Sequence, residues 1–127
     1  MQPIETPEAP RPAGHYSQAV AHGGLVFVAG QLPLDPASGA LVGAGDIEAQ
    51  AEQVLRNVEA VLRAAGSDLD RLLSVTVYLT DRAYWAPVNQ VYARLLGAHR
   101  PARAVVPVPE LRHGCLIEVQ AIAARAE

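Results

Sequence analysis

Residues 46–80 read DIEAQAEQVLRNVEAVLRAAGSDLDRLLSVTVYLT, a stretch that predicts a helix followed by a strand. Asp46 is a residue type that often caps the start of a helix, and Gly66 is the type that most often ends one. Between them apolar residues recur at intervals of three, four and seven, so we expect a helix over residues 47–65 with one buried face. The apolar positions of that face are Ile47, Val54, Leu55, Val58, Val61, Leu62 and Ala65.

The end of this stretch, residues 73–80, alternates between apolar and hydroxyl-bearing side chains, which is the two-residue period of a strand. The residues expected to face the core are Leu73, Val75, Val77 and Leu79. The residues expected on the other face are Ser74, Thr76, Tyr78 and Thr80. Such a hydroxyl-lined face is expected either to meet solvent or to dock against another subunit.

Further strands and a second helix flank this unit. The other predicted strands cover residues 2–6, 17–22, 25–31, 102–107 and 115–124. Gly23-Gly24 predicts a hairpin, and the strand that follows it is apolar without alternation, as expected for a strand covered on both faces. A second helix is predicted over residues 84–99, with Pro101 ending it.

The order of these elements favours an α+β fold, with both helices packed on one face of a mixed sheet. The length of 127 residues fits one domain, 1–127, and half of the residues are apolar, which is enough for a core. The single cysteine, Cys115, excludes a disulfide within the chain and suits a reducing compartment.

Charge, hydropathy and motif spacing narrow the expected location and partners. The first residues lack the features of a secretory leader and no apolar run approaches the about 20 residues that span a bilayer, so we expect a cytoplasmic protein without a membrane partner. The net charge of −3 argues against nucleic acid as a partner. The histidines and Cys115 lack the spacing of a metal site, and no glycine-rich nucleotide motif is present, so neither metal nor cofactor is expected.

Two charged residues lie within apolar runs and are candidates for function. Arg103 lies in PARAVVPVP (residues 101–109), and its planar fork suits a carboxylate, although from the pattern alone an exposed arginine on an edge strand is favoured. Glu118 lies in LIEVQAIA (residues 116–123), where partial burial would raise its pKa and suit it to accept a proton or position a water. A solvated strand face explains the Glu118 pattern equally well.

Six short motifs occur in order along the chain. They are IxTxxAPxPxGHYSQAV at residues 4–20, FVAGQLP at 27–33, QVLRN at 53–57, VNxxY at 88–92, PAR at 101–103 and IEVQAIA at 117–123. Each motif is weak alone, but the ordered set resembles the RidA family (YjgF/YER057c, formerly described as endoribonuclease L-PSP) over essentially the whole chain.

The resemblance implies a chorismate-mutase-like α+β domain that forms a homotrimer with clefts between subunits. It also implies a 2-iminobutanoate/2-iminopropanoate deaminase, which without a cofactor hydrolyses reactive 2-imino acids and enamines such as 2-aminoacrylate to 2-keto acids and ammonia. In that family pattern Arg103 matches the residue that binds the small substrate's carboxylate, and Glu118 matches the one that holds the attacking water. Tyr16, Gly30 and Asn89 match residues that line the cleft.

Several positions depart from the family pattern. His15 stands where proline is frequent, Ala29 where serine is frequent, Val105 where cysteine is frequent and Gln120 where a second glutamate is frequent. These departures leave open a non-catalytic trimer that binds a carboxylate metabolite or stabilises a partner enzyme. Ribonuclease activity is less favoured, because the chain is acidic and lacks a basic stripe.

Overall fold

The computed structural model describes residues 1–126, and its centre is one six-stranded sheet with the strand order β1-β2-β3-β6-β4-β5. The strands are β1 (Gln2–Ile4), β2 (Ala19–His22), β3 (Leu25–Gln31), β4 (Leu72–Leu79), β5 (Ala102–Pro107) and β6 (Ile117–Ala124). Neighbouring strands are antiparallel except β4 and β5, which are parallel, so the sheet is mixed as predicted.

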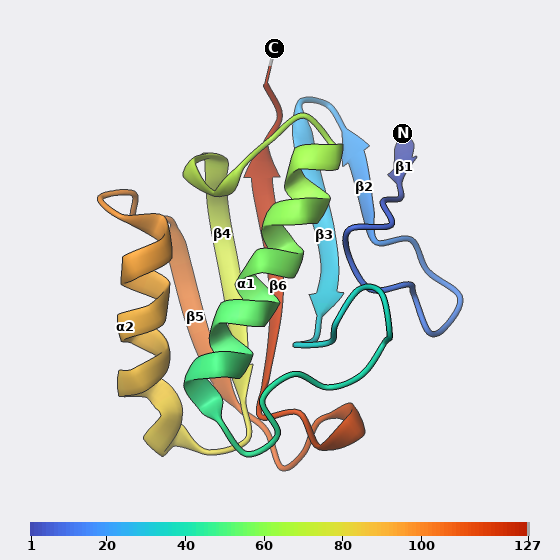
Figure 1. Cartoon of the computed structure of the whole chain (residues 1–127). Coiled ribbons are helices and arrows are strands. Elements are labelled where there is room, and N and C mark those ends of the chain that lie inside the picture. Colours follow the sequence, from blue (N-terminus) through green and yellow to red (C-terminus); the bar gives the residue numbers. More distant parts are fainter. Residues whose placement is uncertain (127) are drawn as a thin grey trace.

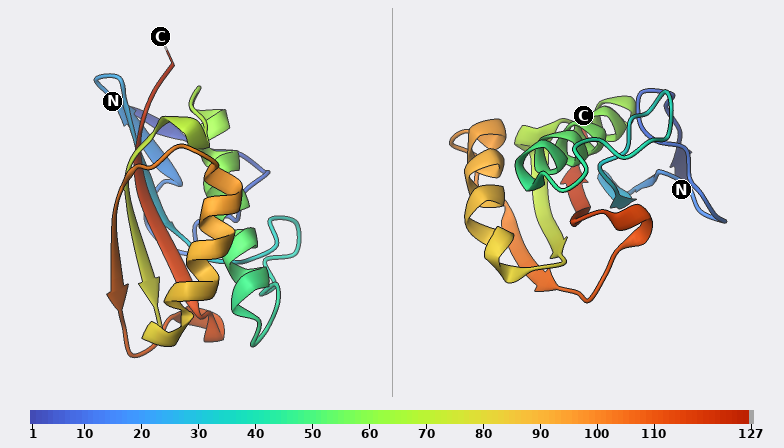
Figure 2. Two further views of the ribbon diagram at one scale, coloured as in Figure 1. Left: turned by 90° about the vertical axis from the view of Figure 1, so that its left-hand side faces the viewer. Right: turned by 60° about the horizontal axis from the view of Figure 1, so that its bottom comes forward.

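The helices α1 (Ile47–Ala64) and α2 (Trp85–Leu96) lie side by side on one face of the sheet (Figures 1 and 2). Short 3₁₀ helices over Leu69–Arg71, Arg82–Tyr84 and Arg112–Gly114 complete the chain. The core fills the space between the helices and the sheet, and no helix of residues 1–126 covers the other sheet face (Figure 2). The predicted α+β class and the placement of both helices on one face are confirmed.

The predicted caps of α1 are present. The Asp46 carboxylate accepts a hydrogen bond from the Ala49 amide at 3.1 Å, and Gly66 follows the helix with a φ of 78°. The helix α2 is shorter than predicted, because Gly97 takes a φ of 62° and ends it well before Pro101.

One predicted core residue of β4 is wrong. Leu72 is 1% exposed and Leu73 is 47% exposed, whereas Val75, Val77 and Leu79 are buried as expected. The pairing of β4 with β6 shifts its register between Leu72 and Ser74, and this irregularity breaks the strict alternation at the start of the strand.

The sheet face opposite the helices, called here the open face, has apolar as well as polar side chains. Phe27 on β3 is 43% exposed there, and it lies in register with Ile122 of β6. The prediction that this strand is covered on both faces is therefore wrong for the single chain. Of the predicted hydroxyl-lined set, Ser74, Thr76 and Tyr78 lie on this face, where Tyr78 Oη donates to Gln120 Oε1 at 3.3 Å. Thr80 lies beyond the end of β4.

Candidate functional site

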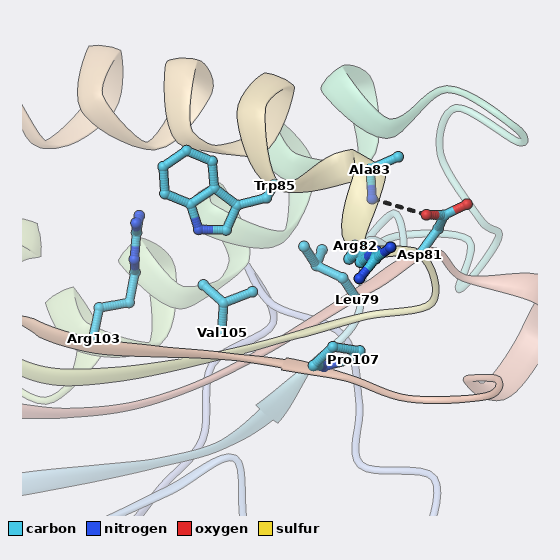
Figure 3. Close-up of a pocket in the computed structure, with 8 residues that line it drawn as sticks. All are labelled: Leu79, Asp81, Arg82, Ala83, Trp85, Arg103, Val105 and Pro107. Carbon is cyan, nitrogen blue, oxygen red and sulfur yellow. Dashed lines mark hydrogen bonds between the residues drawn. The ribbon is translucent and has the colours of Figure 1, made fainter.

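Arg103 projects from the edge strand β5 toward α2. It lies in register with the buried Val75, so its side chain is on the helix face of the sheet (Figure 3). Its guanidinium carbon is 4.7 Å from the centre of the Tyr92 ring and 5.8 Å from the centre of the Trp85 ring. Both distances suit cation–π attraction, which holds the charged group in one place.

The charge on Arg103 is held but not neutralised. Within residues 1–126, the ion pairs of the structure involve Arg56, Arg63 and Arg94, and none involves Arg103. Since Arg103 is half-buried rather than exposed, the interpretation of an ordinary surface arginine does not describe it. A half-buried guanidinium without an acidic partner is a suitable binding group for an anion.

Two hollows meet at Arg103. One, of about 730 Å³, lies between β5 and the start of α2 (Figure 3), and its lining includes Leu79, Asp81, Arg82, Ala83, Trp85, Arg103, Val105 and Pro107. The other, of about 440 Å³, is lined by Asn89 and Tyr92 together with Arg103. We call Arg103, Asn89, Tyr92 and Trp85 the Arg103 half-site. Sequence reasoning missed Trp85, which belongs to none of the motifs, and it named Tyr92 only as part of the VNxxY motif, with no role toward Arg103.

Glu118 lies on the other face of the sheet. It is on β6 between the buried Ile117 and Val119 and in register with Tyr78, so it projects from the open face. Glu118 is half-buried, and this burial raises the pKa of its carboxyl, against the opposing effect of the Arg112 charge.

Gly30 lies directly against the Glu118 carboxylate. The register between β3 and β6 shifts between Val28 and Gln31, and Gly30 lies within this irregular segment. A β-carbon added at Gly30 would collide with Glu118 Oε2, so the absence of a side chain permits this close approach.

Tyr16 is 50% exposed and lines a small hollow that Gly30 also lines, together with Arg11, Arg112 and His113. Its hydroxyl accepts a hydrogen bond from the Ala13 amide at 3.3 Å. We call Tyr16, Gly30 and Glu118 the Glu118 half-site. The structure therefore brings Tyr16, Gly30 and Glu118 together, and it separately brings Asn89 and Arg103 together.

The two half-sites do not meet within one chain. The side chains of Arg103 and Glu118 leave the sheet on opposite faces, as their register with Val75 and Tyr78 on β4 requires. A substrate in contact with both charged groups would therefore need a second copy of the chain. Sequence motifs selected these residues but carried no information on which face each one occupies.

The described part of the chain gives little support for a metal site, a membrane-spanning helix or a cysteine nucleophile. Residues 1–126 contain no cluster of three or more metal-binding side chains, and none of their helices could cross a membrane. Cys115 is buried, and burial, with a further effect of the Glu118 charge, raises the pKa of its thiol. A buried thiol with a raised pKa is a poor nucleophile.

Comparison with known proteins shows similarity over nearly the full chain. The family model described as Endoribonuclease L-PSP matches residues 6–125. A RutC family protein of Pyrococcus horikoshii is 48% identical over 94% of both chains, and the 2-iminobutanoate/2-iminopropanoate deaminase of Mus musculus is 40% identical over 94% of this chain and 88% of that protein. The crystal structure of RidA from Psychrobacter sp. PAMC 21119 has a TM-score of 0.94 at 40% identity, covering 98% of this chain and 99% of the other.

Proposed function

The chain belongs to the RidA family, described in its family model as Endoribonuclease L-PSP, and from that premise we propose that it hydrolyses small 2-imino acids to 2-keto acids and ammonia. The mouse relative named 2-iminobutanoate/2-iminopropanoate deaminase supports this reaction class. The observation that carries the proposal is Arg103, a guanidinium held against aromatic rings without an acidic partner in the described chain.

In the proposed reaction Arg103 binds the substrate carboxylate through two charge-assisted hydrogen bonds. This contact fixes the imine carbon and so removes much of the entropic barrier to attack by water. Asn89 shares the hollow with Arg103 and supplies an amide for a further hydrogen bond to the bound substrate.

Glu118 is proposed to position the attacking water and to accept its proton. Water adds to the C=N carbon, the imine nitrogen gains protons, and the C–N bond of the tetrahedral adduct breaks to give a 2-keto acid and ammonia. The raised pKa of Glu118 suits this role, because a carboxylate that is more basic than usual accepts a proton more readily near neutral pH. The imine is already electrophilic, so this proposal involves no cofactor.

We further propose that the active unit is a homotrimer whose clefts lie between subunits. The opposite placement of Arg103 and Glu118 supports this arrangement, because a cleft that contains both needs the helix face of one subunit and the open face of the next. Such a contact joins unlike surfaces, and head-to-tail contacts of this kind form a closed ring when the rotation from one subunit to the next closes, as in the proposed trimer. Phe27, Leu73 and Val106 are large apolar residues that are exposed in the single chain, and contacts between subunits would bury them.

The direct test supplies 2-aminoacrylate from a dehydratase and follows the formation of pyruvate. Acceleration over the spontaneous reaction is the expected result, and the Arg103→Ala variant is expected to lose it. If the wild-type protein gives no acceleration but binds pyruvate through Arg103, the chain is a binding module and not a deaminase.

A further inference from the structure

The small hollow lined by Gly30, the residue that lies against Glu118, has a cationic rim that the proposed hydrolysis does not use. Arg11, Arg112 and His113 line it together with Tyr16 and Gly30. Among residues 1–126 neither Arg11 nor Arg112 forms an ion pair, although Glu118 lies close enough to Arg112 for the arginine to affect its pKa. The rim therefore holds positive charge in a chain whose net charge is −3.

The backbone beneath the rim has an unusual conformation. His113 has a φ of 60° and a ψ of 19°, and it is the only residue other than glycine with a positive φ within residues 1–126. This left-handed turn, over Arg112–Gly114, leads into Cys115 and then into the strand of Glu118. Such conformations cost energy and are concentrated at functional sites, and this one directly follows Arg112 at the hollow.

We propose that this rim recognises a second acidic group, so that the chain accepts 2-imino dicarboxylic acids, with the 1-carboxylate on Arg103 and the distal carboxylate on Arg112 and Arg11. The inference rests on the proposed function, and it adds the substrate class. Arg112 and Arg11 line the same hollow as Tyr16 and Gly30 of the Glu118 half-site, whereas Arg103 belongs to the other half-site, so the two carboxylates would be held from the two sides of one cleft. The reaction is the same hydrolysis: 2-iminosuccinate and water give oxaloacetate and ammonia.

The chemistry of the rim favours a carboxylate over an apolar group at this end of the substrate. An apolar side chain placed here would leave two guanidinium groups without partners while reducing their contact with water, which costs free energy. A distal carboxylate would instead receive charge-assisted hydrogen bonds from either arginine.

The test compares two imines that differ in the distal carboxylate. An amino-acid oxidase with oxygen and catalase generates 2-iminopropanoate from alanine or 2-iminosuccinate from aspartate, and keto acid formation is measured against the spontaneous rate. We expect wild-type protein to accelerate both reactions. In Arg112→Ala the ratio of kcat/KM for iminosuccinate over iminopropanoate is expected to fall about tenfold, the value of one hydrogen bond to a charged group.

Three further variants test whether the charges of the rim cause the preference for iminosuccinate over iminopropanoate. Arg11→Ala is expected to lower the same ratio, and Arg112→Lys is expected to retain part of it because the charge remains. Arg71→Ala is the matched control, because Arg71 is exposed on a different 3₁₀ helix and forms no ion pair within residues 1–126, and its ratio is expected to stay at the wild-type value.

The same measurements distinguish a failure of the proposed deaminase function from a failure of the dicarboxylate inference. If neither imine is hydrolysed faster than spontaneously, the proposed function itself is wrong. If iminopropanoate is accelerated and iminosuccinate is not, or if Arg112→Ala lowers both rates equally, the deaminase proposal stands and the dicarboxylate inference is overturned.

Discussion

Arg103 combines a fixed position with a charge that has no acidic partner within residues 1–126, and substitutions of Arg103 distinguish the contributions of these two properties. Arg103→Lys keeps the charge but loses the planar fork and the stacking on Tyr92. We expect this variant to raise KM for the imine about tenfold and Arg103→Ala to lower kcat/KM about a hundredfold, as expected for one or two lost charge-assisted hydrogen bonds. Steady-state kinetics with iminopropanoate measures both, with Arg71→Ala as the control. Equal activity of Arg103→Ala and wild type would remove Arg103 from the site.

Glu118 predicts a particular pH dependence of activity. Burial raises the pKa of its carboxyl, so the proposed base loses its negative charge at a higher pH than an exposed glutamate does. We expect kcat/KM, after subtraction of the spontaneous rate, to fall as the pH decreases through this raised pKa. Glu118→Gln should lower the activity and abolish this acid limb. An unchanged limb in Glu118→Gln would assign the titration to another group.

The same raised pKa predicts an effect of pH on stability. A carboxyl whose pKa is higher in the folded than in the unfolded chain binds its proton more tightly when folded, so stability is lost as the pH rises from the ordinary pKa through the raised one. Glu118→Gln lacks this loss. We therefore expect the variant to be more stable than wild type at neutral pH and the difference to shrink at acidic pH, as measured by urea unfolding at a series of pH values.

Tyr92 stacks under Arg103, and its hydroxyl is buried without a hydrogen-bond partner in the described chain. Burial raises the pKa of this hydroxyl, against the opposing effect of the Arg103 charge, so it remains neutral. Tyr92→Phe keeps the ring and removes the unsatisfied group, and we expect the free energy of unfolding to rise by up to about 1 kcal/mol. A loss of similar size in denaturant unfolding would reveal a partner for the hydroxyl in the assembled protein.

At the scale of elements, the irregular pairing of β3 with β6 forms the Glu118 half-site. Gly30→Ala would place a methyl group where Glu118 Oε2 lies, and the movable side chain rather than the backbone would yield. We therefore expect a large loss of kcat with little loss of stability, since the carboxylate is displaced from the position beside the imine that is proposed for it. Gly14→Ala is the control, because its added β-carbon would lie at an ordinary contact distance of 3.5 Å from the Tyr16 ring. Wild-type kcat in Gly30→Ala would show that the position of this carboxylate is unimportant.

The elements of this chain were predictable where local rules fix them. The cap at Asp46 and the glycine after α1 bound that helix as predicted, and the bounds Ala102–Pro107 of β5 were also predicted. The burial of Leu73 and the end of α2 were predicted wrongly. A register shift depends on the partner strand, and the prediction ended the helix at Pro101, whereas Gly97 ends it earlier by taking a positive φ. Local periodicity cannot report either effect.

For the whole molecule, sequence motifs identified Arg103 and Glu118 but not their separation. Strand periodicity tells which residues share a face of one strand, and it does not tell how the faces of β5 and β6 relate until both are paired to β4. The cation–π contacts of Arg103 with Trp85 and Tyr92 could not be predicted for a similar reason, since they form between β5 and α2.

If each cleft takes Arg103 from one subunit and Glu118 from the next, two inactive variants should complement each other. Arg103→Ala and Glu118→Gln, refolded together in equal amounts, would form mixed rings in which about one quarter of the clefts contain both intact residues, because each of the two subunits at a cleft has an even chance of being the required variant. We expect activity to return to about that fraction of the wild-type value, while each variant refolded alone stays inactive. Mixed rings verified by native mass spectrometry but without activity would place both residues in a site within one subunit, against the opposite faces that they occupy on the sheet.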